Sequence, residues 1–402
     1  MRFVEVGNLQ YEQEFDTLRA GAIMSETYFV TGGAGFVGAN FVRYLLKNTA
    51  AKVVVVDKLV RSGSWENLAA CESDSRFSFF EVDTADGRGL RAILRTAKPT
   101  KVVHLAGETS VDRSIDEARI FMKTNVGGAF EVAQQCRQIL AGYDDDRLSR
   151  FSLVHVSSLR AAGPVGENGE PLGPTSPAAA SALAAESIVL SYHRTYGLPY
   201  LVVRASNLMG PWQFPEKLLP LVVARALQGA SIPLYGDGTP RRDWMAVDDF
   251  CSGLLAASKR GRYGAVYEMG RGETTTNHEL VARILAALEV ERPAAKNPAM
   301  QSAGYSEYAQ LVTPVDDRPA HDRAYRPVSP AARDDLGWRP QKSLEDSIAK
   351  TVRWVLQNEA WATEIVERAG WQGERLGLGL APMDSEKRVA AGSPASNRPL
   401  IP

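Results

Sequence analysis

Three glycines and one aspartate carry the clearest chemical signal in this sequence. Gly32, Gly35 and Gly38 form a GxxGxxG pattern between a strand-like run and a helix-like run, and Asp57 follows Gly32 by 25 residues. Such glycines let the backbone turn tightly and approach a pyrophosphate at the positive end of the helix. A carboxylate at the end of the next strand accepts hydrogen bonds from both ribose hydroxyls and repels a 2′-phosphate. The pattern therefore predicts a dinucleotide site that favours NAD over NADP.

Three more charged residues bear on the same site. Lys58 and Arg61 bring positive charge close to Asp57, which softens the preference for NAD. Asp83 ends the next strand-like run, where its carboxylate could reach an adenine ring. The charges therefore favour NAD without excluding NADP.

The elements that must hold these residues alternate between strand and helix. The runs AKVVVVDKL, FSFFEVD, KVVHLAG and FSLVHVSS are typical of short buried strands. Helix-like segments such as 118–140 separate them. Strands that alternate with helices form βαβ units with right-handed crossovers. We therefore predict an α/β fold, with a Rossmann-like doubly wound parallel sheet and a smaller mixed C-terminal substrate lobe.

The character of the chain changes in its second half. GPWQFPEKLLP, IPLYGDGTPRRDW and TPVDDRPAHDRAY are rich in Pro, Gly and charge, which is typical of loops over a second lobe. The residues after 372 lack periodicity, which is typical of disorder. We predict an N-terminal extension over 1–23, an NAD-binding domain over 24–209, a substrate lobe over 210–372 that exchanges some chain with it, and a disordered tail over 373–402.

Composition argues against several classes of function. The 402 residues include 46 basic and 47 acidic side chains, so the formal charge of -1 gives no field that would recruit nucleic acid or an anionic membrane. The three cysteines and five histidines are scattered, which argues against a disulfide framework or a metal site and fits a cytoplasmic protein. We find neither a signal peptide nor a membrane span, and translation could start at Met1 or Met24.

Longer motifs resemble the extended short-chain dehydrogenase/reductases, within the NAD-dependent epimerase/dehydratase family, and more narrowly the dTDP-glucose 4,6-dehydratases. TGGAGFVGANFV and VDKL match the nucleotide end, and HLAGETSVDRSI is similar to the family's HLAAESHVDRSI. TYGLP, GPWQFPEKLLPLV, LYGDGTPRRDW and DDRPAHDRAY match the sugar-nucleotide end, so the resemblance spans roughly 25–361. It implies NAD bound by Gly32, Gly35, Phe36, Val37, Gly38, Asp57, Lys58, Asp83, Thr84, Leu105, Ala106, Gly107 and Thr124.

The resemblance also implies how a nucleotide sugar would bind. Thr109 falls at a hexose contact, Asn207 and Arg242 fall at diphosphate contacts, and Tyr235 falls in a pocket for a thymine ring. No metal is implied. The implied substrate residues are Thr109, Asn207, Lys217, Leu218, Pro233, Leu234, Tyr235, Arg242, Asn277, Arg318 and His321.

The family's tyrosine and lysine pair is absent. The family pattern SPYSASK aligns without gaps on SPAAASA, so Ala178 stands at the tyrosine that acts as base and Ala182 at the lysine that lowers its pKa. None of the thirteen tyrosines has a lysine at the fourth residue after it. Ser176 and Pro177 are a plausible start signal for an alanine-rich helix. The segment therefore predicts a helix whose functional face carries no catalytic side chain.

A second catalytic set is also absent. Where the dehydratases have STDE, this chain has SSLR, so Leu159 replaces the acid and Arg160 the base. Ala162 and Leu208 replace an aromatic and an asparagine of the family pattern. Leucine and alanine carry no titratable proton, and arginine stays protonated. The polar groups left as catalytic candidates are Ser158, Arg160 and Glu108.

Two functions remain open. One is an enzyme of altered chemistry, a lyase or isomerase in nucleotide-sugar or natural-product metabolism, with Arg160 neutralising an anion or oxyanion. The other is a catalytically dead protein that binds NAD and a sugar nucleotide as a sensor or as the partner of an active paralogue. An ordinary dehydratase is disfavoured because SP and TYGLP flank the altered segment without gaps. In the family, the helices at 118–140 and 178–196 pair in a dimer, which implies a homodimer or a heterodimer with a paralogue.

Overall fold

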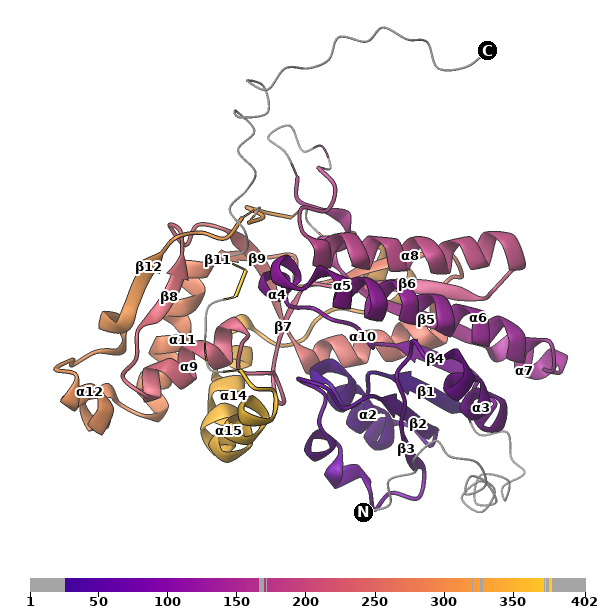
Figure 1. Ribbon diagram of the computed structural model, residues 1–402, viewed down its shortest axis with the longest axis horizontal. Coiled ribbons are helices and arrows are strands. Elements are labelled where there is room, and N and C mark those ends of the chain that lie inside the picture. Colours follow the sequence, from indigo (N-terminus) through magenta and orange to yellow (C-terminus); the bar gives the residue numbers. More distant parts are fainter. Residues whose placement is uncertain are drawn as a thin grey trace, which may run out of the picture.

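The computed structural model describes residues 26–165, 170, 172–319, 321–325, 328–371, 373, 376 and 377. The predicted N-terminal extension and nearly all of the predicted disordered tail lie outside the described residues. Within the described part, seven parallel strands form the main sheet in the order β10-β6-β5-β4-β1-β2-β3 (Figure 1). They are β1 (Thr27–Thr31), β2 (Lys52–Asp57), β3 (Phe77–Glu81), β4 (Lys101–His104), β5 (Ser152–Ser158), β6 (Tyr200–Ala205) and β10 (Val266–Met269). The predicted doubly wound parallel sheet is confirmed.

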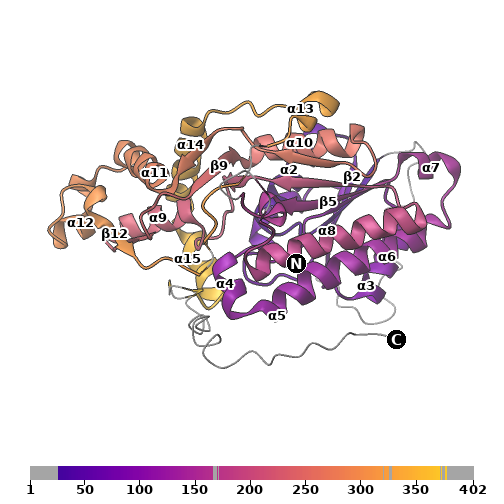
Figure 2. The same ribbon diagram turned by 90° about the horizontal axis from the view of Figure 1, so that it is seen from above.

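The sheet is buried on both faces because helices cover each of them (Figure 2). The four valines of β2 are therefore all buried, which explains a strand without polar alternation. One face packs against α2 (Phe36–Asn48), α10 (Val247–Arg260) and α13 (Ala331–Leu336). The other packs against α3 (Gly87–Ala97), α6 (Gly128–Leu140) and α8 (Pro177–Tyr196).

The predicted helix over 118–140 is interrupted by a π-helical turn. α5 (Ala118–Phe121) leads into the π turn Met122–Gly127, and α6 follows without a break. Such turns widen a helix locally and frequently lie at functional sites. Here the π turn carries Thr124 and Asn125, which face the site described below. The short helices α4 (Val111–Asp116) and α7 (Asp145–Arg150) flank this region.

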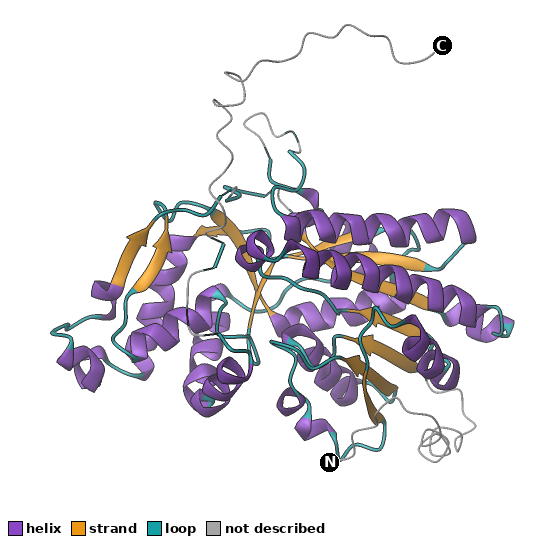
Figure 3. Ribbon diagram, viewed as in Figure 1, coloured by secondary structure: helices purple, strands orange, loops and turns teal. Residues whose placement is uncertain are grey.

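A smaller lobe lies beside the sheet (Figure 3). It contains a mixed sheet of β7 (Asn207–Met209), β9 (Arg241–Ala246) and β11 (Thr274–Thr276), and a pair of parallel strands, β8 (Ile232–Tyr235) and β12 (Val312–Val315). Its helices are α9 (Leu218–Leu227), α11 (Asn277–Glu291), α12 (Pro298–Ser302), α14 (Leu344–Gln357) and α15 (Glu359–Arg368).

The prediction of loops in this lobe was partly wrong. β8 lies inside a stretch that its prolines, glycines and charges marked as loop, and β9 and β12 overlap such stretches for most of their length. These strands have only 4 to 6 residues and are stabilised by pairing with segments distant in the sequence, which local composition does not reveal. The chain also returns to the main sheet through α10 and β10.

No helix in the described residues has both the length and the apolarity to cross a membrane.

Candidate functional site

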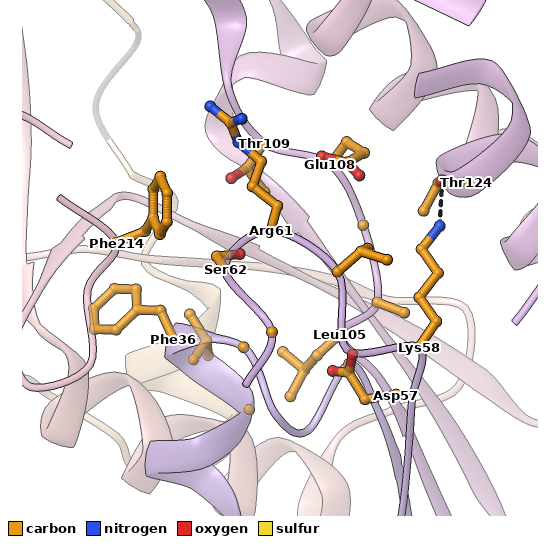
Figure 4. A pocket seen from close by; sticks show the side chains of 18 of the residues that line it. Phe36, Asp57, Lys58, Arg61, Ser62, Leu105, Glu108, Thr109, Thr124 and Phe214 are labelled. Atoms are coloured by element: carbon orange, nitrogen blue, oxygen red, sulfur yellow. Dashed lines mark hydrogen bonds between the residues drawn. The ribbon is translucent and has the colours of Figure 1, made fainter. Parts of the chain in front are cut away.

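A cavity opens where the strand order of the sheet reverses, beyond the ends of β1 and β4. Ligands of open α/β sheets bind in this kind of crevice. Figure 4 shows Asp57 and Lys58 together on one side of the cavity and Phe36 and Phe214 together on another. Predicted NAD residues lining it are Gly32, Gly35, Phe36, Val37, Gly38, Asp57, Lys58, Thr84, Leu105, Ala106, Gly107 and Thr124, and it also includes Glu108, Thr109 and Lys217.

The glycine turn has the geometry that the motif predicts. Gly32 has φ +68°, and a Cβ there would lie 2.5 Å from the backbone nitrogen of Ala106. A Cβ on Gly38 would lie 2.1 Å from the carbonyl oxygen of Gly32. A Cβ on Gly35 would have only one neighbour, at 3.4 Å. The first glycine therefore lets the turn approach the loop after β4, the third lets the turn close on itself, and the second leaves its surface open to a ligand.

The first turn of α2 is suited to an anion. Gly35 is its N-cap residue, no side chain caps the helix, and no acidic residue lies in the first turn. Its first backbone N–H groups therefore keep their hydrogen-bonding capacity and the positive end of the helix dipole. The open glycine surface and this helix start fit the pyrophosphate of a dinucleotide.

Asp57 is held in place by the backbone at the edge of the cavity. Its Oδ2 accepts a hydrogen bond from the Ala34 N–H at 3.0 Å, and its Oδ1 accepts one from the Leu59 N–H at 2.9 Å. Burial raises the pKa of the carboxyl, and these backbone bonds oppose the rise. Each oxygen still has a lone pair for a ribose hydroxyl, so the residues present fit a dinucleotide.

The Lys58 ammonium is engaged by Thr124 and Asp83. Its Nζ donates to Thr124 Oγ1 at 3.2 Å and lies 3.6 Å from Asp83 Oδ2. Asp83 is thus tied to Lys58, and it does not line the cavity, whereas its neighbour Thr84 does. The positive charge of Lys58 is partly neutralised by this pair.

Sequence reasoning missed an ion pair that joins the two lobes over the cavity. Arg61, which lies on the loop after β2, pairs with Glu216, which precedes α9. Lys217 lies 3.2 Å from the same carboxylate. Burial alone would raise the pKa of Glu216, but Lys217 and Arg61 bring it below its ordinary value. No sequence signal could find this pair, because its members are 155 residues apart in loops.

The alanine-rich segment forms α8, as predicted. Ser176 caps the helix by accepting from the Ala179 N–H at 3.3 Å, Pro177 occupies the first turn, and Gly197 ends the helix with φ +68°. Ala178 is buried against Val111 and Phe121. Ala182 is half-buried and likewise offers only a methyl group. Neither side chain can donate or accept a proton at these positions, where the resemblance implies a tyrosine and a lysine.

The segment after β5 is equally poor in titratable groups. Leu159 and Ala161 are buried in a short 3₁₀ turn, Leu159–Ala162. The Ser158 hydroxyl accepts from the Arg160 N–H at 3.3 Å, so it fixes the turn. The Ser157 hydroxyl is buried without a hydrogen-bond partner among the described residues.

Glu108 is fixed by its neighbours on both sides. Its carboxylate accepts from Arg113 Nη1 at 2.9 Å. Its backbone N–H donates to Asn125 Oδ1 at 2.7 Å, and Asn125 also donates to the Ser181 hydroxyl on α8 at 2.8 Å. The π turn thereby ties the loop after β4 to α8, and Glu108 is committed to an ion pair.

A second cavity lies at the implied nucleotide end and includes Asp112, Pro233 and Tyr235. The Tyr235 hydroxyl donates to Asp112 Oδ2 at 3.0 Å, and Arg318 pairs with the same carboxylate. His321 contacts Asp317 at 2.7 Å, and its pKa lies below the ordinary value, mainly because of burial. The geometry therefore brings Tyr235, Arg318 and His321 into one region, as the resemblance implies.

Arg242 is occupied by the protein itself. It is 4% exposed, and its guanidinium donates to the carbonyl oxygens of Arg241, Asp322 and Arg323. Its role at a diphosphate stays a prediction. The other implied substrate residues are placed as follows: Asn207 begins β7, Lys217 precedes α9, Leu218 begins α9, Leu234 is buried in β8, and Asn277 begins α11.

Among the described residues, no three His, Cys, Asp or Glu side chains gather in a way that could hold a metal ion.

Comparisons with known proteins point to one family. A family described as GDP-mannose 4,6 dehydratase matches residues 29–351. The chain is 37% identical over 356 residues to the dTDP-glucose 4,6-dehydratase of Neisseria meningitidis, covering 87% of this chain and 98% of that protein.

Solved structures give the same answer. The dTDP-glucose 4,6-dehydratase of Streptomyces venezuelae, solved with NAD and TYD bound, has a TM-score of 0.74 and 36% identity, covering 84% of this chain and 99% of that one. The enzyme of the same name from Bacillus anthracis, in complex with NAD, has a TM-score of 0.72 and 31% identity, covering 85% and 100%.

Proposed function

Because the chain belongs to the NAD-dependent epimerase/dehydratase family, we propose that it binds NAD and a nucleotide sugar and does not catalyse ordinary 4,6-dehydration. The single observation that carries this proposal is that four positions of the expected reacting centre hold no group able to exchange a proton. Ala178 and Ala182 lie on α8 where the family has a tyrosine and a lysine, and Leu159 and Arg160 follow β5 where it has an acid and a base. Each lost acid or base costs about 10²–10⁴-fold in rate.

The NAD half of the proposal rests on the first cavity. The N-terminal turn of α2 would hold the pyrophosphate and Asp57 the adenine ribose, and Thr124 and Glu108 also line the cavity. NAD supplies a hydride acceptor when it is bound. The relatives solved with NAD support the same cofactor here.

Within this proposal, altered chemistry has named candidates. Ser158 and Arg160 keep polar groups after β5, and Arg160 contacts Thr109, which lines the NAD cavity. A reaction that depends on orientation and charge neutralisation needs few titrating groups. We therefore favour a lyase or isomerase of changed chemistry over an inert protein.

Binding without turnover is the second candidate, and two observations favour it. Ala178 is packed against apolar side chains, so it leaves no polar group beside the expected nicotinamide position. Glu108 is committed to Arg113. A sensor or the partner of an active paralogue would need no more than the two binding regions.

The test is an incubation of the purified protein with NAD and dTDP-glucose, followed by mass spectrometry for the 4-keto-6-deoxy product. The expected result is no product above the uncatalysed background. A variant that combines Ala178→Tyr, Ala182→Lys, Leu159→Asp and Arg160→Glu should gain activity if the pockets are intact. A matched control combines Ala180→Tyr and Ala184→Lys, which place the same side chains elsewhere on α8, and should gain none.

For the assembly, a homodimer through α6 and α8 is the favoured arrangement. These helices pack side by side (Figure 2). Phe130 of α6 and Tyr196 of α8 are 42% and 52% exposed, and Met122, in the π turn before α6, is 42% exposed. Replacing Phe130 and Tyr196 with glutamate should convert a dimer into a monomer in light scattering, because charges are costly in an apolar interface. A wild-type monomer at micromolar concentration would contradict the homodimer, and mixing with a paralogue would then test the heterodimer.

A further inference from the structure

Arg160 is the one residue of the altered centre that adds a charge. It lies in the 3₁₀ turn after β5, and the Ser158 hydroxyl fixes its backbone. Its Nη1 donates to the carbonyl oxygen of Thr109 at 3.4 Å. Thr109 lines the NAD cavity, so the guanidinium lies next to a residue of the cavity wall.

The guanidinium has no anionic partner within the described part of the chain. Its Nε is buried and makes no hydrogen bond there. A buried donor that lacks an acceptor is unfavourable, and more so when it belongs to a charged group. An anionic acceptor supplied by a ligand would remove this cost.

The nearby carboxylates are already engaged. Glu108 pairs with Arg113, and Asp112 pairs with Arg318. Asp322 accepts hydrogen bonds from Thr175 and from Tyr325. None of them neutralises Arg160.

Arg160 shares its surroundings with a second guanidinium, that of Arg242, and with the Asp322 carboxylate. Arg242 lies 4.9 Å above the ring of Tyr325. Burial raises the pKa of Tyr325 to about 12, while the charges of Arg160 and Arg242 oppose this rise. Two guanidinium groups therefore act on one buried ring. The guanidinium of Arg242 donates its hydrogen bonds to backbone carbonyl oxygens, whereas the Nε of Arg160 has no acceptor among the described residues.

We propose that Arg160 binds a carboxylate on the sugar of the substrate, so that the protein prefers a nucleotide-linked uronic acid to a neutral hexose. This inference rests on the proposed function and specifies its substrate class. A planar guanidinium binds a carboxylate through two parallel hydrogen bonds, whereas a neutral hydroxymethyl group leaves the charge uncompensated. We expect Arg160 to bind the sugar and not the diphosphate of the substrate. Arg160 contacts Thr109 at the NAD cavity, where the sugar would lie, whereas Tyr235 and Arg318 lie at the second cavity, at the implied nucleotide end.

The experiment measures binding by calorimetry for five probes: dTDP, dTDP-glucose, dTDP-glucuronic acid, UDP-glucose and UDP-glucuronic acid, with NAD present. For at least one base, the glucuronic acid form should bind wild-type protein at least about tenfold more tightly than the glucose form. Arg160→Gln should remove this difference and leave the affinity for dTDP unchanged. Arg160→Lys should retain part of it, because the charge remains. Arg241→Gln, which changes a neighbouring exposed arginine of β9, should behave like wild type.

Three results would overturn the inference. Equal or weaker binding of the glucuronic acid form would exclude a carboxylate site. An equal loss of dTDP affinity in Arg160→Gln would assign Arg160 to the diphosphate. A preference that persists in Arg160→Gln would place the carboxylate elsewhere. If none of the five probes binds, the nucleotide-sugar part of the proposed function fails first, and the inference fails with it.

Discussion

Replacing Gly38 with alanine is expected to abolish NAD binding. The new Cβ would lie 2.1 Å from the Gly32 carbonyl oxygen and 2.5 Å from the Gly33 Cα. Both neighbours are backbone atoms, so the turn itself must open. That displacement moves the first N–H groups of α2, which the pyrophosphate needs. We expect at least about a 100-fold loss of NAD affinity, measured by calorimetry.

Gly35→Ala is the control for the stability of this variant and not for its NAD binding, because Gly35 itself lies at the expected pyrophosphate position. Its Cβ would have one neighbour, at an ordinary contact distance of 3.4 Å, so the protein should fold with an unchanged midpoint of thermal unfolding. Gly38→Ala should unfold at a lower temperature, since overpacking costs about 1–3 kcal/mol. Wild-type NAD content and thermal stability in Gly38→Ala would show that the turn is not closed as described.

Replacing Arg204 with leucine is expected to cause the largest loss of stability. Arg204 lies on β6 and joins Glu186 of α8 to Glu268 of β10, at 2.7 Å and 3.4 Å. Both carboxylates are buried, at 6% and 2% exposure. Burial alone would lower the pKa of Arg204, but its bonds to the carboxylates more than offset this. Removing the cation takes the shared ion-pair partner from two buried carboxylates, so the free energy of unfolding should fall by about 3–5 kcal/mol in urea.

A triple variant separates charge from packing in this cluster. Glu186→Gln and Glu268→Gln, added to Arg204→Leu, remove the two carboxylate charges and should recover part of the lost free energy of unfolding. Arg283→Leu removes an exposed ion pair with Glu345 and should change stability by less than about 1 kcal/mol. If the triple variant is less stable than Arg204→Leu alone, the carboxylates do not cause the loss.

Local patterns in the sequence were enough to predict the sheet and the glycine turn. The valines of β2 and the spacing of Gly32, Gly35 and Gly38 act through neighbours in the chain, and Ser176 and Pro177 start α8 where predicted. Glu186 shows the limit. Its sequence context shows a single charge in an alanine-rich helix, but Glu186 is buried because Arg204 of β6 pairs with it in the folded protein.

The candidate site also contains residues that the sequence could predict and contacts that it could not. The predicted NAD residues, apart from Asp83, line one cavity because the ends of parallel strands meet at one edge of the sheet. The pair between Arg61 and Glu216 and the occupation of Arg242 by carbonyl groups depend on how loops of two lobes fold together. Spacing in the sequence carries no information about such contacts.

The most direct test of the central claim is the turnover of dTDP-glucose by the purified protein loaded with NAD. The account predicts bound NAD, detected by absorbance and mass spectrometry, together with no 4-keto-6-deoxy product. Formation of that product at a rate typical of enzymes, about 1–10³ s⁻¹, would contradict it. The surface built from Ala178, Ala182, Leu159 and Arg160 would then not be the place where the chemistry occurs.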